Sequence, residues 1–143
     1  MMTNNDLVGF EHIGMTVADL DRTVAFYCDL LGLELVLRKP QATGELGFFD
    51  AGGGMLEVIA PSDGAARAED VPNGRSGMRH LTLSYTSINA VLDRLRDAGV
   101  EIIEEAREAY NQEMLQRVAF VRDPDGIIVE LAERTPGRPT RQA

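Results

Sequence analysis

The chain has 143 residues, which favours one domain with a substantial hydrophobic core. Fourteen Lys and Arg residues against 23 Asp and Glu residues give a net charge of −9, so we expect neither a nucleic-acid nor a membrane partner. Cys28 is the single cysteine, which excludes an internal disulfide and a thiolate zinc site, and without a recognisable signal peptide or membrane span we expect a cytoplasmic protein.

One pattern occurs twice along the chain. Residues 12–21 and 80–89 match in their apolar and polar positions, and a predicted helix follows in each copy, at 19–31 and 87–98, with Asp19 and Ser87 as N-caps. Three short strands follow each helix. They are predicted at 33–36, 46–49 and 55–60 in the first copy and at 100–103, 117–121 and 127–132 in the second. The sequence therefore predicts an α+β fold of two tandem βαβββ modules, forming a cupped mixed sheet with the helices outside.

The predicted boundaries make this a single domain. Module 1 spans about residues 8–60 and module 2 about 78–133. The segment 61–77 is rich in Gly, Pro and Ala and is predicted as the linker, and the tail 134–143 is expected to fray. We expect the loops at 61–77 and 104–116 to shape a cleft.

Histidine and glutamate recur at matching places in the two copies. The two histidines, His12 and His80, occupy the same position of each copy, and Glu57 and Glu130 each interrupt an apolar last strand. Strand alternation places both histidines on a polar face opposite the helices. An isolated carboxylate in a half-buried strand is costly unless it is paired, exposed or bound to a metal. These four residues therefore predict a site for one divalent ion (Zn, Ni, Co, Mn or Fe) with a place open for substrate, and packing or ion pairing is the alternative.

Other polar or reactive residues give weaker signals. Gly52-Gly53-Gly54 lies between two predicted strands and is interpreted as a hairpin turn, not a phosphate loop. Cys28 is interpreted as a small residue at the edge of the core. Arg117 and Arg122 flank an apolar run and could bind an anionic substrate, but solvated surface arginine is the favoured interpretation.

Two segments carry a resemblance to a known family. Residues 12–27, His-Ile-Gly-Met-Thr-Val-Ala-Asp-Leu-Asp-Arg-Thr-Val-Ala-Phe-Tyr, resemble the opening of vicinal oxygen chelate proteins, and residues 123–131, Asp-Pro-Asp-Gly-Ile-Ile-Val-Glu-Leu, resemble their closing strand. The resemblance covers about residues 8–133 and implies paired βαβββ modules around a metal. It places four residues at the ligand positions of glyoxalase I and methylmalonyl-CoA epimerase, namely His12, Glu57, His80 and Glu130.

Details of the resemblance point to different members of the family. Thr16 stands where glyoxalase I has an arginine for glutathione. Residues 73–80 are similar to the corresponding run of the epimerases, and Glu45 falls where their second acid-base residue lies. Residues 123–126, however, replace the His-Pro-Lys run of the epimerases. Glutathione and coenzyme A therefore both stay open as cosubstrate.

The resemblance implies a metal-dependent lyase or isomerase that abstracts a proton next to a carbonyl of a small metabolite. Glu130 would act as the base and Glu45 as its partner. An extradiol-type dioxygenase and a non-catalytic drug- or metabolite-binding resistance protein are the alternatives. The cup can form within one chain or across a dimer, and we expect a homodimer because the sheet edges need covering.

Overall fold

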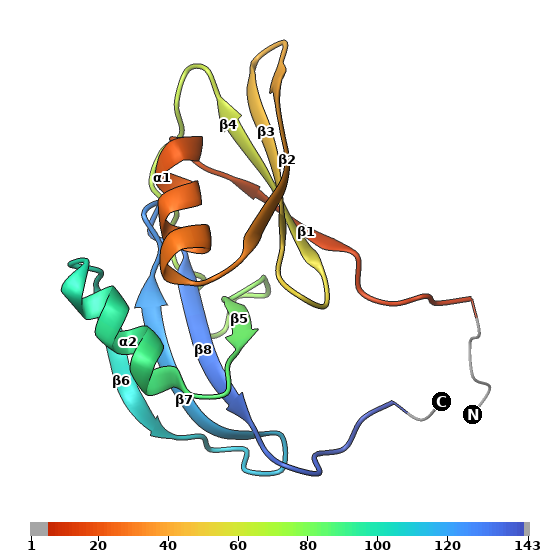
Figure 1. Cartoon of the computed structure of the whole chain (residues 1–143), viewed down its shortest axis with the longest axis vertical. Helices are drawn as coiled ribbons and strands as arrows, with labels where there is room; N and C mark the ends of the chain where they lie inside the picture. The colour runs from red at the N-terminus through yellow and green to blue at the C-terminus, as the bar shows by residue number, and fades with distance from the viewer. Residues whose placement is uncertain (1–5, 142–143) are drawn as a thin grey trace. The chain divides into compact units, whose positions relative to one another are not determined.

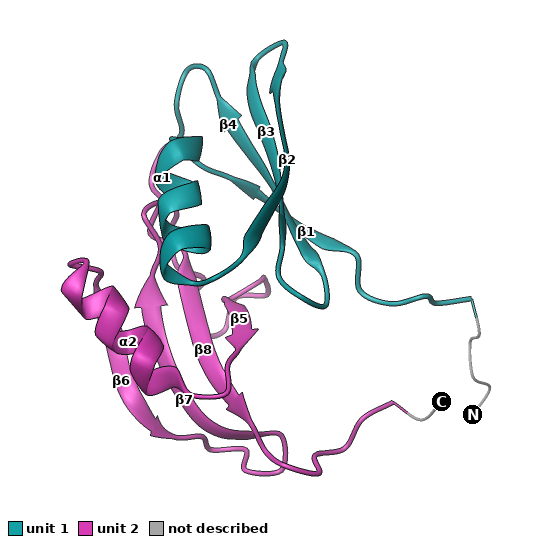
Figure 2. Ribbon diagram, viewed as in Figure 1, with its two compact units in different colours: residues 1–65 teal, residues 66–143 magenta. Residues whose placement is uncertain are grey.

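The computed structural model describes residues 6–141 and divides into two compact units, residues 1–65 and residues 66–143 (Figures 1 and 2). The division falls within the predicted linker 61–77. Both units contain one sheet and one helical segment, in the predicted βαβββ order. The predicted α+β fold of two such modules is therefore confirmed. Among residues 6–141, no helix is both long and apolar enough to cross a membrane.

Unit 1 is built on a four-stranded mixed sheet (Figure 1). Its elements are β1 (His12–Thr16), α1 (Leu20–Val24), η1 (Ala25–Leu30), β2 (Glu34–Gln41), β3 (Gly44–Asp50) and β4 (Met55–Pro61). The strand order is β1-β4-β3-β2, with β1 parallel to β4 and the other pairs antiparallel. The strands lie where the sequence predicts them, and β2 extends several residues further.

The helical segment of unit 1 begins as predicted and then changes its hydrogen bonding. Asp19 caps it, because its Oδ1 accepts from the Arg22 N–H at 3.2 Å. From Ala25 onward the helix is of the π type. Phe26 and Tyr27 within this segment are both buried, with their rings edge-to-face at 4.9 Å. The apolar spacing predicted one continuous α-helix and could not show this change.

Unit 2 repeats the topology of unit 1 (Figure 2). Its elements are β5 (Leu81–Ser84), α2 (Ile88–Asp97), β6 (Ile102–Glu108), β7 (Leu115–Arg122) and β8 (Ile128–Arg134). The strand order is β5-β8-β7-β6, with β5 parallel to β8. The sheet position of each strand is thus the same as in unit 1, and β8 extends into the first residue of the predicted tail.

The N-terminus of α2 is capped in a way that the sequence did not reveal. Ser87 holds the N-cap position, but its side chain makes no capping hydrogen bond. The Ile88 N–H donates instead to Oε2 of Glu133, at 2.8 Å. The prediction of Ser87 as the N-cap residue is therefore confirmed, but a carboxylate from β8, and not the serine hydroxyl, supplies the acceptor.

Strand β6 also corrects a prediction. Residues 104–116 were expected to form a loop, but the strand continues to Glu108 and only residues 109–114 connect it to β7. Two register shifts, between Ile102 and Glu104 and between Glu104 and Arg107, interrupt the pairing with β7. These shifts break the alternation of apolar and polar residues by which a strand is recognised.

Each sheet has one face that packs against its helix. In unit 1 a Cβ added at Gly47 of β3 would lie 3.3 Å from the Leu20 side chain of α1, so the face that carries Gly47 and Phe49 is the helix side. In unit 2 Glu133 of β8 contacts the first residue of α2, which marks the corresponding face. Because side chains alternate along a strand, Glu57 and Glu130 each lie on the face of their own sheet that points away from the helix.

Candidate functional site

The first His–Glu pair joins the first and last strands of unit 1. His12 opens β1, and Gly14 of that strand pairs directly with Glu57 of β4. The Nε2 atom of His12 is 3.9 Å from Oε2 of Glu57, and its Nδ1 atom is 3.3 Å from Oε1 of Glu11. About a third of each of the paired side chains is exposed (36% and 32%). The structure therefore brings together the two residues that the sequence predicted from this module.

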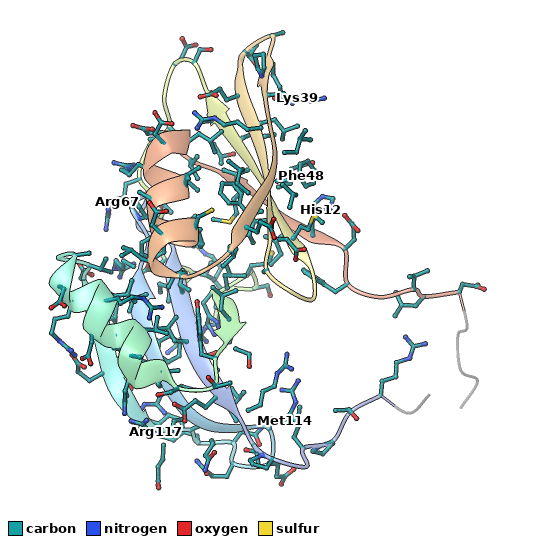
Figure 3. All side chains as sticks on the ribbon, viewed as in Figure 1. His12, Lys39, Phe48, Arg67, Met114 and Arg117 are labelled. Carbon is teal, nitrogen blue, oxygen red and sulfur yellow. The ribbon has the colours of Figure 1, made fainter. Side chains whose placement is uncertain are left out.

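An aromatic ring packs against the histidine of this pair. Phe48 of β3 lies directly opposite Glu57 in the sheet register. Its ring stands edge-to-face to the His12 imidazole, with the ring centroids 5.8 Å apart, and both side chains can be followed in Figure 3. Phe48 was missed from the sequence.

The second pair occupies the equivalent place in unit 2. His80 immediately precedes β5, and Glu130 lies in β8, with 3.8 Å between Nδ1 of His80 and Oε1 of Glu130. Phe120 pairs with Glu130 across the β7–β8 hairpin and meets the His80 ring edge-to-face at 5.5 Å. The arrangement of His, Glu and Phe is therefore repeated in both units.

The two pairs differ at one position. Thr82, which pairs with Glu130, lies where unit 1 has Gly14. The Thr82 hydroxyl donates to Oε1 of Glu130 at 2.8 Å and lies 3.0 Å from Nδ1 of His80. Glu130 is also the more buried of the two carboxylates, with 10% of its side chain exposed against 32% for Glu57.

A small apolar cluster lies on the Glu130 face of unit 2. It consists of Ala109, Val118 and Ala132, with Leu115 and Phe120 packed against them. Arg107 of β6, which pairs with Val118, stands at its edge with its guanidinium 4.1 Å from the centre of the Tyr110 ring. The Glu104 carboxylate, and to a smaller extent the charge of Glu130, raise the pKa of Arg107. This cation was also missed, because the register shifts in β6 hide which face it occupies.

The four predicted metal ligands lie as two separate His–Glu pairs, one in each unit. Over residues 6–141 no group of three or more His, Cys, Asp and Glu side chains is close enough to hold an ion. Each pair nevertheless has suitable chemistry, since imidazole nitrogen and carboxylate oxygen both bind first-row divalent ions. In unit 1 the Nε2 atom of His12 and Oε2 of Glu57 are 3.9 Å apart, so both could contact one ion after a side-chain movement. The residues present fit a divalent ion of the predicted kind.

Glu45 is placed differently from the other predicted site residues. It pairs with Ala60 on the helix side of the sheet, the face opposite to Glu57. Its carboxylate accepts from Nε and Nη2 of Arg38 at 2.9 and 3.0 Å, and Arg38 also bonds Asp21. These two carboxylates, Glu45 first, raise the pKa of Arg38. The structure thus does not bring Glu45 to the His–Glu pair of its own unit.

Two arginines that were interpreted as solvated are bound within unit 2. Arg122 contacts Asp70 at 2.8 Å and Glu101 at 2.9 Å, and 21% of its side chain is exposed. Arg117 contacts Asn89 of α2 at 3.2 Å. Both arginines lie at the surface, as interpreted, with 33% and 21% of their side chains exposed, and both are held by partners far away in the sequence.

Comparisons with known proteins identify the family. A family model described as the glyoxalase/bleomycin resistance protein/dioxygenase superfamily matches residues 9–131. The chain belongs to this superfamily. The resemblance of its first and last motifs to vicinal oxygen chelate proteins is therefore confirmed.

Three members of the superfamily illustrate the similarity. A probable lactoylglutathione lyase of Synechocystis is 30% identical over 123 residues, covering 85% of this chain and 92% of its own length. The lactoylglutathione lyase of Salmonella typhimurium is 29% identical over 124 residues, covering 85% and 90%. The crystal structure of a glyoxalase family protein from Enterococcus faecalis has a TM-score of 0.69 at 25% identity, covering 88% of this chain and 98% of that protein.

Proposed function

We propose that this protein is a metal-dependent lyase or isomerase of the glyoxalase type, which abstracts a proton next to a carbonyl of a small metabolite. The observation that carries the proposal is the repeated arrangement of His, Glu and Phe at the same sheet positions of both units. The relatives named lactoylglutathione lyase support a lyase of this type. A structural ion pair alone would not require the same three residues in each module.

Four residues would hold the ion, namely His12, Glu57, His80 and Glu130. Two nitrogen and two oxygen donors accept Zn, Ni, Co, Mn or Fe, and availability often decides among them. When bound, a divalent cation stabilises the negative charge that develops on a carbonyl oxygen as the neighbouring proton leaves. We propose that the two pairs act on the same ion, either within one chain or between two copies.

The environment of Glu130 supports its role as the base. Its carboxylate is largely buried, and one of its oxygens accepts a hydrogen bond from Thr82. Proton transfer needs a base held within hydrogen-bonding reach of the substrate carbon, and a carboxylate fixed on a strand meets that condition better than one on a mobile loop. The nearby apolar cluster would exclude water from the same region.

Solvent exchange tests the proposal directly. The full chain, supplied with each candidate metal in turn, is incubated in deuterium oxide with α-hydroxy carbonyl compounds, glutathione hemithioacetals and acyl thioesters. We expect metal-dependent incorporation of deuterium at the α-carbon of at least one class, with loss in Glu130→Gln. Glu105→Gln is the matched control, because Glu105 is 63% exposed and pairs with Arg96. Absence of exchange with every class and metal would contradict the proposal, and oxygen uptake by the iron-loaded protein would favour a dioxygenase instead.

We also propose that the protein is a cytoplasmic homodimer. The edge strand β2 supports the dimer, because Val36 and Leu37 on it are 47% and 44% exposed. Light scattering at micromolar concentration is expected to give twice the mass of the chain, and a monomer would contradict this part of the proposal.

A further inference from the structure

Thr82 links the histidine and the glutamate of unit 2. Its hydroxyl oxygen lies 2.8 Å from Oε1 of Glu130 and 3.0 Å from Nδ1 of His80, whereas the direct distance between those two residues is 3.8 Å. A distance of 3.8 Å is too long for a hydrogen bond, so the contact between them runs through the hydroxyl.

The number of available protons fixes the direction of both hydrogen bonds. A hydroxyl has one proton to donate, and an ionised carboxylate can only accept. The Thr82 proton is therefore used in the bond to Glu130. The second contact then requires His80 Nδ1 to carry a proton and donate it to the Thr82 oxygen. In a neutral imidazole this leaves Nε2 with a free lone pair, and Nε2 is then the nitrogen that can bind a metal.

Unit 1 lacks this link. The equivalent position is Gly14, which has no side chain to place between His12 and Glu57. The contact at His12 Nδ1 comes instead from Glu11, a residue with 78% of its side chain exposed, at 3.3 Å. The two His–Glu pairs thus occupy equivalent positions in their sheets, but only the pair in unit 2 is bridged by a hydroxyl group.

The burial of Glu130 explains why such a link matters there. A buried carboxylate is costly without hydrogen-bond donors, and Thr82 supplies one from the paired position of the neighbouring strand. Residue Thr82 is itself exposed, so removing its hydroxyl need not disturb the core. Its loss would free both the Glu130 carboxylate and the His80 ring to rotate.

We propose that Thr82 is a positioning residue that orients Glu130 and holds His80 in the tautomer whose Nε2 is free to bind a metal. The metal-binding part of this inference rests on the proposed function, whereas the tautomer is a property of the metal-free chain. In metal sites, the hydrogen-bond partners of ligating residues change metal affinity by about 10-fold to 100-fold when they are removed.

Imidazole ¹⁵N NMR of the full, metal-free chain at alkaline pH tests the tautomer. The chain has two histidines, so the signals are assigned by comparison with His12→Asn. We expect His80 to show a protonated Nδ1 and an unprotonated Nε2. Thr82→Val should give a mixture of tautomers, and Thr82→Ser, which keeps the hydroxyl, should restore the wild-type signals. A protonated Nε2 in the wild type, or an unchanged spectrum in Thr82→Val, would overturn the inference.

Metal affinity provides the second readout. Calorimetric titration with Ni and Zn should show binding about 10-fold or more weaker in Thr82→Val than in the wild type, with recovery in Thr82→Ser. Thr43→Val is the matched control, because Thr43 is an exposed threonine in the turn between β2 and β3 and is expected to leave affinity unchanged. Equal affinity in Thr82→Val and the wild type would overturn the positioning role. If the wild type binds no metal, the proposed function fails, and the NMR result alone decides the role of Thr82.

Discussion

Replacing Glu133 by alanine should destabilise the protein by about 2 kcal/mol. Its Oε2 atom accepts the Ile88 N–H at the first turn of α2, a capping interaction typically worth about 1 kcal/mol. The negative charge at a helix N-terminus adds about 0.3–1 kcal/mol. The ion pair with Arg117, at 3.6 Å with a third of the arginine exposed, adds about 0.5 kcal/mol at most.

The matched control for this prediction is Ser87→Ala. Ser87 occupies the N-cap position but makes no capping hydrogen bond through its side chain, so its replacement should change the free energy of unfolding by less than about 0.5 kcal/mol. Urea unfolding followed by circular dichroism measures both variants, and a loss of 2 kcal/mol lowers the midpoint by about 1 M. A larger loss in Ser87→Ala than in Glu133→Ala would refute the reasoning, because the serine would then be the functional cap.

Three further predictions concern ionisation and backbone packing. Burial raises the pKa of Tyr85 from its ordinary value to about 12, so folding stability should fall as pH rises through about 10 to 12, and less steeply in Tyr85→Phe. Arg122 lowers the pKa of Asp70, so the stability that this pair contributes should disappear in acid, and Asp70→Asn should flatten the acid limb of the stability curve. Gly44→Ala should lower the urea midpoint far more than Gly14→Ala, because a Cβ at Gly44 would overlap the backbone carbonyl of Ala60.

The internal repeat is the reason why the His–Glu residues could be predicted from sequence. A histidine in one strand has many explanations, but His12 and His80 fall at the same place of two modules, and the structure puts Glu57 and Glu130 beside them. Strand alternation then correctly predicted the face on which they lie. The same reasoning could have found the phenylalanines, because Phe120 sits opposite Glu130 across a short hairpin.

The remaining features depend on contacts between residues that are distant in the sequence. The Glu133 cap joins β8 to the start of α2, and Arg122 binds Asp70 in the predicted linker. No motif near these residues in the sequence indicates either contact. The second half of β6 was missed for a different reason, since the register shifts around Glu104 remove the alternation that identifies a strand. The contact of Thr82 with Glu130 could be recognised only from the pairing register of β5 and β8, which residue propensities do not predict.

Metal titration of the chelator-treated full chain tests the central proposal most directly. Calorimetry with Ni, Co, Zn, Mn and anaerobic ferrous iron is compared among the wild type, His12→Ala and His80→Ala, with Glu105→Gln as the control. We predict binding of about one ion per chain in the wild type and the control, with loss in both histidine variants, because each unit would supply half of the proposed ligands. Failure of every ion to bind the wild type, or unchanged binding in either histidine variant, would contradict the account.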